Sequence, residues 1–177
     1  VGVGQSETAC HSMVDFFLLI QLAGTGDELQ GIKRGIMEMA DGIIVNKADG
    51  DNVQRANRAM TEVKNAVHLF PLAESGQPVN VMTCSALTHH NIPEVWGMVT
   101  EHVENIRKSG YLAKKRAKQD VQTMYDSIEQ TLKDTFYQNP LIKDMLALME
   151  SDVKDKRTSA YTAANNLLET YFKTLRR

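Results

Sequence analysis

Net charge, long apolar runs and cysteine are all scarce in this sequence. Its 177 residues carry 20 Lys and Arg against 22 Asp and Glu, which gives a formal net charge of −2 at pH 7. A chain without a basic excess has no overall field that would attract nucleic acid or an anionic membrane surface. The longest apolar run covers residues 16–20, whereas a membrane-spanning helix needs about 20 apolar residues. We therefore expect neither a nucleic-acid partner nor a membrane span.

Only two cysteines are present, Cys10 and Cys84, and they stand far apart without metal-ligand spacing. This usage is typical of a reducing compartment, so we expect a cytoplasmic location and two small, buried side chains. His89 and His90 are adjacent and would point in different directions on any regular element. We interpret them as surface residues of a loop and expect no metal site among these residues.

The pattern G-x-x-x-x-G-K-[ST], which holds the phosphates of a nucleotide and its Mg²⁺, occurs nowhere in the sequence. A complete P-loop nucleotidase needs such a loop. The chain also opens on a glycine-rich stretch, Val1-Gly2-Val3-Gly4-Gln5, without a methionine. We expect it to be a fragment that lacks a larger N-terminal part.

Strand and helix patterns alternate over the first 108 residues. Mostly apolar runs predict buried strands over residues 14–22, 42–46 and 79–84. Apolar residues at helical spacing predict helices over residues 5–13, 28–40, 52–69 and 92–108. The last of these patterns includes Trp96, which we expect in the core. The alternation indicates a parallel α/β sheet with right-handed crossovers, and three strands with open edges again suggest missing strands upstream.

The pattern changes after Gly110, where no further strand is predicted. Helical spacing of apolar residues predicts helices over residues 111–137, 141–150 and 159–175, with a break at Asn139-Pro140. We therefore divide the chain into an α/β portion, residues 1–109, and an all-helical C-terminal extension, residues 110–177. Such an arm often packs on a second copy of the chain, although it could fold back on its own domain. The basic cluster at residues 114–118 favours a solvated helix face or a partner contact over nucleic acid.

The stretch IIVNKADGD, residues 43–51, ends a buried strand in Asn46, Lys47 and Asp49. An ionised carboxylate can accept both the N1–H and the N2 amino group of guanine at once, which makes a strong charge-assisted pair. Adenine would present a lone pair instead, so the preference would be roughly 100-fold or more. Asn46 could serve the other edge of the base or brace neighbouring loops, and the Lys47 stem could lie along the ring. The alternative is a strand that ends in a polar turn.

A second element supports guanine recognition. Ser85-Ala86-Leu87 follows the next predicted strand, and ligands of open α/β sheets bind at the carboxyl ends of the strands. The backbone N–H of Ala86 could donate to guanine O6. The alternative for this segment is the loop before a helix.

The opening residues fit a loop around a terminal phosphate. Gly2 could bring its N–H close to an anion, and the helix start behind it would favour negative charge. Gln5 is placed to orient a water molecule. By itself this string is equally compatible with a disordered terminus.

These motifs together carry a resemblance. The segments VGVGQSET, VDFFLLIQLAGTGDELQGIKRGIMEMAD, IIVNKADGD, TCSAL and GYLAKKRAKQD are very similar to the MeaB/ArgK family of P-loop GTPases. Members of that family are chaperones of adenosylcobalamin-dependent methylmalonyl-CoA mutase and are often labelled arginine/ornithine (LAO/AO) transport ATPases. The resemblance spans nearly the whole chain and weakens after about residue 125. It implies the C-terminal portion of such a GTPase: part of the P-loop sheet followed by the helical extension.

The resemblance also implies roles for individual residues. The guanine site would comprise Asn46, Lys47 and Asp49, closed over by Ser85, Ala86 and Leu87. Gly2 and Gln5 would belong to the second switch, with Gln5 as the catalytic residue, and Lys33 would contact nucleotide or switch residues from a further mobile loop.

Partners and cofactors follow from the same resemblance. They are GTP or GDP, Mg²⁺ with ligands mainly in the missing part, the mutase, and a second copy of the chain bound through the C-terminal helices. We expect the isolated chain to be inactive. The alternatives are a non-enzymatic dimerisation module and a transport-associated ATPase.

Overall fold

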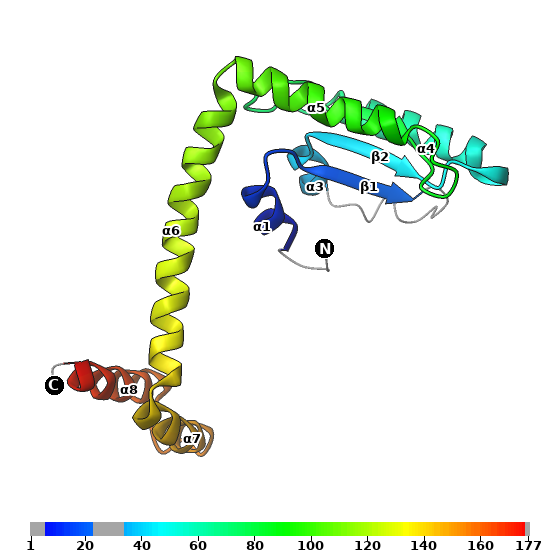
Figure 1. Ribbon diagram of the computed structural model, residues 1–177. Coiled ribbons are helices and arrows are strands. Elements are labelled where there is room, and N and C mark those ends of the chain that lie inside the picture. The colour runs from blue at the N-terminus through cyan, green and yellow to red at the C-terminus, as the bar shows by residue number, and fades with distance from the viewer. Residues whose placement is uncertain (1–5, 23–33, 176–177) are drawn as a thin grey trace. The chain divides into compact units, whose positions relative to one another are not determined.

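The structure is a computed structural model, and it describes residues 6–22 and 34–175. The chain forms two compact units that divide between Gln119 and Asp120 (Figure 1). This boundary lies inside helix α6 (Tyr111–Gln138). The start of α6 belongs to the first unit because its polar side chains bond to residues near the first strand.

The first unit contains a three-stranded parallel sheet in the order β1 (Leu18–Leu22), β2 (Gly42–Asn46), β3 (Asn80–Thr83). Ile44 of the central strand stands beside Ile20 on one side and Met82 on the other. β2 is the central strand and is covered by helices on both faces, and four of its five residues are buried. The predicted parallel α/β sheet followed by helices is confirmed.

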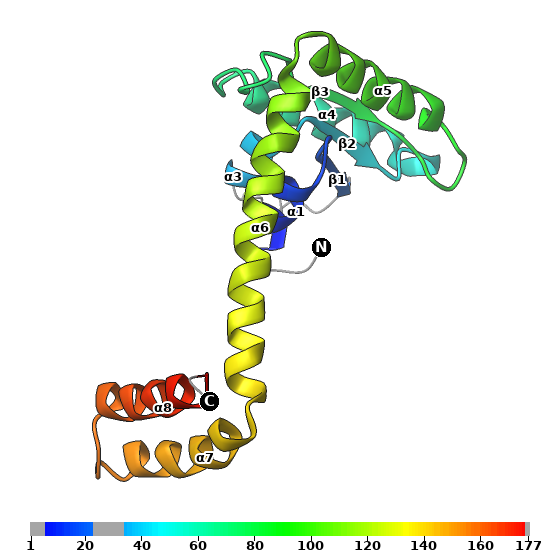
Figure 2. The same ribbon diagram turned by 60° about the vertical axis from the view of Figure 1, so that its left-hand side comes forward.

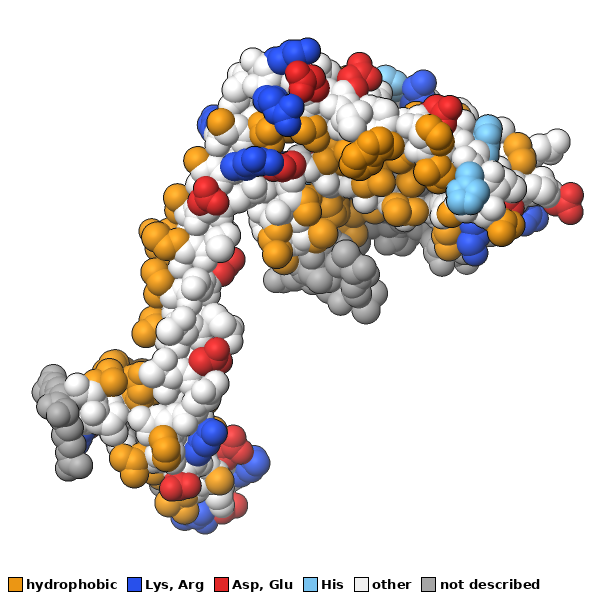
Figure 3. Space-filling model, in the orientation of Figure 1, with side chains coloured by type: hydrophobic (Ala, Val, Ile, Leu, Met, Phe, Trp, Pro, Cys, Tyr) orange, Lys and Arg blue, Asp and Glu red, His pale blue; other side chains and the backbone are white. Residues whose placement is uncertain are grey.

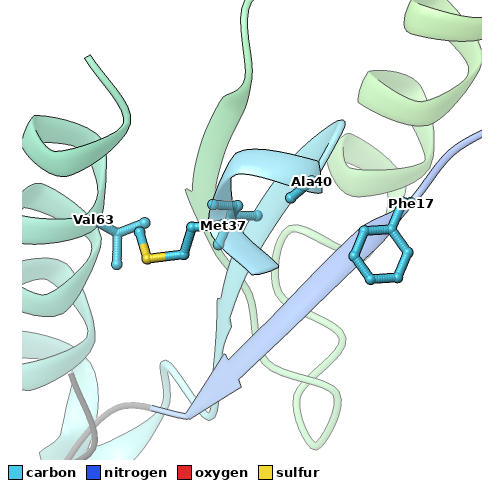
Figure 4. Packing of buried hydrophobic residues seen from close by; sticks show 5 residues of the cluster. Phe17, Met37, Ala40 and Val63 are labelled. Carbon is cyan, nitrogen blue, oxygen red and sulfur yellow. The ribbon is translucent and has the colours of Figure 1, made fainter. Parts of the chain in front are cut away.

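Helices cover the two faces of this sheet. The face that carries Ile43 packs against α1 (Ser6–Met13), α3 (Arg34–Met39) and α4 (Val53–Val67), and Figure 4 shows Met37 and Val63 meeting there. Ile44 points to the opposite face, as the alternation of a strand requires, and packs against α5 (Ile92–Lys108). A short 3₁₀ helix, η1 (Gly50–Asn52), links β2 to α4.

Gly42 allows two large side chains to pack over the start of β2. A Cβ at this position would lie 2.8 Å from Phe16 Cζ and 2.9 Å from Met98 Cε. Real Cβ atoms essentially never approach other atoms so closely. A larger residue at Gly42 would therefore force the Phe16 and Met98 side chains to shift.

Two sequence-based expectations were wrong in detail. The strand predicted over residues 14–22 begins only at Leu18, because the backbone of Phe17 bonds to Asp41 instead of to a neighbouring strand. Trp96 is 67% exposed rather than buried. The buried face of α5 is rotated away from it and includes a polar residue, His102. That face comprises Val95, Met98, His102 and Ile106.

The second unit contains the remainder of α6 together with α7 (Pro140–Lys154) and α8 (Ala160–Leu175), which pack on each other (Figure 2). Asn139 caps α7 by accepting a hydrogen bond from the N–H of Leu141, and Pro140 occupies its first position. Ile142, Leu167 and Tyr171 form the small core of the pair. The three predicted helices are confirmed. Within residues 6–22 and 34–175, no helix combines the length and the apolar character that a bilayer crossing requires.

Candidate functional site

The candidate site lies where β2 and β3 end side by side. The N–H of Cys84 donates to the Val45 carbonyl at 2.9 Å, and the N–H of Ala48 donates to the Cys84 carbonyl at 2.9 Å. These two bonds continue the strand pairing beyond the last ladder position, Val45 beside Thr83. The two polar segments after the strands are thereby held against each other, as expected at the carboxyl edge of a parallel sheet.

Asn46 links the two segments through its side-chain oxygen. Oδ1 accepts the N–H of Lys47 at 2.7 Å and the N–H of Ala86 at 3.1 Å, and the Cys84 Sγ lies 3.7 Å from it. Burial raises the pKa of that thiol, so Cys84 is a neutral donor here. Asn46 therefore braces the loops, and the Ala86 N–H that was assigned to guanine O6 is directed at Asn46 in this structure.

Asp49 is held by the loop after β3. Its Oδ2 accepts a hydrogen bond from the Ser85 hydroxyl, and Ser85 itself is fully buried. The same hydroxyl oxygen accepts the N–H of Thr88 at 3.1 Å, while the N–H of Ser85 donates to the His90 carbonyl at 3.0 Å. No hydrogen bond to Asp49 Oδ1 forms within the described part of the chain. Asp49 is therefore fixed in orientation by one oxygen and keeps acceptor capacity.

The turn between Asn46 and Asp49 adopts an unusual backbone. Lys47 has φ 62° and Gly50 has φ 50°. A left-handed conformation at a residue with a side chain costs roughly 1 kcal/mol, so the surroundings must impose it. The Asn52 amide does so in part by donating to the Lys47 carbonyl at 2.8 Å. Lys47 is exposed, and Leu87 on the other segment is 80% exposed.

Three of the predicted site residues, Gly2, Gln5 and Lys33, lie outside the residues that the structure describes. The six that it describes come from two segments that touch. His89 and His90 are exposed on the loop after β3. Among the described residues, no group of three or more His, Cys, Asp or Glu side chains could hold a metal ion.

The opposite edge of the sheet contains a polar cluster that the sequence did not suggest. Asp41, directly before β2, lies 3.5 Å from Lys115 Nζ and 3.6 Å from His102 Nε2, and all three side chains are at most 12% exposed. Burial lowers the pKa of His102, the Asp41 carboxylate opposes this, and Lys115 adds to it. Arg116 forms a two-pronged pair with Asp15. The basic cluster is therefore not a uniformly solvated face. The only hint of this polar cluster in the sequence is an isolated aspartate, Asp41, directly before a buried strand.

Residues 1–141 match the family model described as "Methylmalonyl Co-A mutase-associated GTPase MeaB". Among curated proteins, a putative GTPase of Caulobacter vibrioides is 37% identical over 97% of this chain and 52% of its own length. The mitochondrial methylmalonic aciduria type A homolog of mouse is 38% identical over 97% of this chain and 41% of its own. The GTPase ArgK of Escherichia coli is 39% identical over 78% of this chain and 42% of its own.

A solved structure is similar as well. The crystal structure of an LAO/AO transport system kinase superposes with a TM-score of 0.69 and 34% identity, over 96% of this chain and 54% of that one. The present chain therefore spans about half the length of the relatives that it matches.

Proposed function

The chain belongs to the MeaB family of mutase-associated GTPases, and from this premise we propose that it reads guanine in a GTP-dependent switch protein. In this proposal the protein hydrolyses GTP and acts as a chaperone of an adenosylcobalamin-dependent methylmalonyl-CoA mutase. The 177 residues form the C-terminal portion of that protein. The observation that supports this proposal is that the Ser85 hydroxyl orients the Asp49 carboxylate at the carboxyl edge of the sheet.

Asp49 is the proposed guanine reader. A carboxylate oxygen can accept more than one hydrogen bond, so Oδ2 can keep the Ser85 hydroxyl and still take a donor from the base. Oδ1 takes the second donor. The N1–H and N2 amino groups of guanine supply two adjacent donors in the required arrangement, and the resulting charge-assisted pair is the stronger kind.

Asn46 and Ala86 are proposed to serve the other edge of the base. The Asn46 oxygen already accepts two backbone N–H groups, which leaves its amide NH₂ as a donor toward guanine. The Ala86 N–H would be shared between Asn46 and guanine O6 when a base is present. Lys47 and Leu87, both exposed, would cover the two faces of the ring.

The phosphate half of the site is proposed to lie largely outside this chain. Gly2 would donate its N–H to the terminal phosphate, Gln5 would orient the attacking water, and Lys33 would contact nucleotide or switch residues. The chemistry that Mg²⁺ would supply is neutralisation of phosphate charge, and no cluster of ligands for it is found among the described residues. We expect the isolated 177 residues to be inactive.

The partners are proposed from the relatives and the helices. The mouse relative's name refers to methylmalonic aciduria and the family's description to the mutase, which supports a mutase partner, and the cytoplasm is the proposed location. We assign residues 1–109 to the GTPase domain and residues 110–177 to a dimerisation extension. A row of apolar side chains along α6 supports the latter (Figure 3). These residues are 48–61% exposed: Val121, Met124, Tyr125, Ile128 and Leu132.

The test is a base-specificity switch in the full-length protein. Asp49→Asn replaces an acceptor by a donor, so it should lower the preference for GTP over XTP by about 100-fold, the order expected when a buried polar partner is mismatched. Competitive binding of labelled GTP and XTP measures it. Asp51→Asn, which removes the same charge from an exposed position two residues away, is the matched control and should leave the preference unchanged.

The rival function is a non-enzymatic dimerisation module, which the exposed apolar row on α6 favours. The same experiment separates the two functions. If the wild-type protein binds neither nucleotide and still self-associates, the module is correct. If GTP preference survives Asp49→Asn, Asp49 is not the reader.

A further inference from the structure

The beginning of α6 is fixed to the short segment between α1 and β1. The Arg116 guanidinium donates to both oxygens of Asp15, at 3.0 Å from Nε and 2.5 Å from Nη2. Gln119 Nε2 donates to the Val14 carbonyl at 2.9 Å, and Lys115 Nζ donates to the Asp15 carbonyl at 3.0 Å. Arg116 also holds the pKa of Asp15 below its ordinary value. Two of the acceptors are backbone carbonyls, so the contacts hold the main chain itself.

Asp41 ties this segment to the sheet. Its Oδ2 accepts the N–H of Phe17 at 2.8 Å and lies 3.5 Å from Lys115 Nζ, while its own N–H donates to the Phe17 carbonyl at 3.0 Å. The Asp41 and Lys115 side chains are 11% and 12% exposed. Water therefore screens this pair poorly, and separating the two charges would be costly. We call the six residues Val14, Asp15, Asp41, Lys115, Arg116 and Gln119 the α6 clasp.

The α6 clasp lies between two elements with different tasks. Val14 directly follows α1, whose His11 packs edge-on against Phe17 with ring centroids 5.7 Å apart. On the other side, α6 runs on as a helix to Gln138 and carries the exposed apolar row into the second unit. A displacement of α1 that carries Val14 and Asp15 with it would break these hydrogen bonds unless the start of α6 moves as well. The clasp thus joins the segment directly after α1 to the start of α6.

We propose that the α6 clasp transmits the nucleotide state from α1 to α6 and so controls the helix that leads into the second unit. This inference rests on the proposed function, because α1 follows the residues assigned there to the second switch. The clasp is at the amino edge of the sheet and the guanine site is at the carboxyl edge, so clasp residues do not touch the base. Its role is regulatory rather than catalytic. Such coupling needs an element with two states that both sites bias, and in this proposal that element is α6.

The experiment is hydrogen exchange of the full-length protein, loaded with GDP or with a non-hydrolysable GTP analogue and followed in peptides covering residues 120–138. In the wild type, the exchange rates in the two states should differ by at least about fivefold, the lower end of usual allosteric coupling. Arg116→Ala/Gln119→Ala should abolish the difference while GTP affinity is retained. Asp15→Asn weakens the paired hydrogen bonds from Arg116 but keeps the contacts to the backbone of Val14 and Asp15. It should reduce the difference in exchange rate only partly.

Lys114→Ala is the matched control, since it removes one positive charge from an exposed position on the same helix. It should preserve the full difference. A nucleotide-dependent difference that persists in the Arg116→Ala/Gln119→Ala variant overturns the proposal, as does a wild type that binds GTP and shows no difference. A wild type that binds no GTP refutes the proposed function instead, so the two failures are distinguishable.

Discussion

The two carboxylates that flank β2 have opposite surroundings. Asp41 precedes the strand, is largely buried, and receives the Phe17 N–H and the Lys115 ammonium. Asp49 follows the strand, is half-buried, and receives the Ser85 hydroxyl. The Asp41 carboxylate is thus paired by groups of the chain itself. The Asp49 carboxylate keeps free acceptor capacity within the described part of the chain.

In the proposed function, one strand serves stability at its amino end and guanine binding at its carboxyl end. Ligands of parallel α/β sheets bind at the carboxyl ends of the strands, where Asp49 lies. The amino end of the strand is not needed for ligand binding and can therefore be stabilised by internal ion pairs. A binding residue that were satisfied as fully as Asp41 would have nothing left to offer a ligand.

The sharpest test of this contrast is to neutralise each carboxylate. Asp41→Asn would leave the Lys115 ammonium poorly hydrated and without a counter-charge, so we expect the free energy of unfolding to fall by about 3 kcal/mol. Asp49→Asn keeps an oxygen that can accept the Ser85 hydroxyl and loses only the negative charge at a half-exposed group, so we expect less than about 1 kcal/mol. Urea denaturation followed by circular dichroism measures both. Equal losses would show that the two edges do not differ in this way.

A smaller effect is expected at the residue that orients Asp49. Ser85→Ala removes the hydroxyl donor to Asp49 and the acceptor of the Thr88 N–H, at a fully buried position. We expect a loss of about 1–2 kcal/mol in the free energy of unfolding. GTP affinity of the full-length protein should fall as well. Ser127→Ala, at an exposed position of α6, is the control, and a Ser85 variant that matched it in both measurements would contradict the assigned role.

The smallest effect is a pH dependence at the amino edge. Burial, aided by Lys115 and opposed by Asp41, puts the pKa of His102 below 6.5 in the folded protein. As pH falls through 6.5, the unfolded chain takes up a proton that the folded protein resists, so stability falls until the folded pKa is reached. His102→Gln should flatten the stability profile between pH 7 and pH 5, measured by thermal unfolding. His68→Gln, at an exposed histidine, should leave the profile as in the wild type.

Some elements were predictable from local pattern because local pattern is what forms them. The strand over residues 42–46 and the helix over residues 92–108 begin and end where the sequence predicts. The two polar segments also follow their strands as expected, which brings Asn46 and Ala86 within hydrogen-bond distance. The side-chain exposure of α5 was not predictable, because counting apolar residues assigned Trp96 to the core and passed over His102.

The sequence by itself determined the order of strands and helices and the placement of two polar motifs at neighbouring strand ends, since periodicity and strand alternation are properties of consecutive residues. Only the tertiary structure decided which acceptor each donor finds. Asp41 and Lys115 are 74 residues apart in the chain, and Arg116 and Asp15 are 101 apart. Charge pairs at such separations cannot be read from the spacing of residues in the sequence. They form only after packing has removed the surrounding water and brought the elements together.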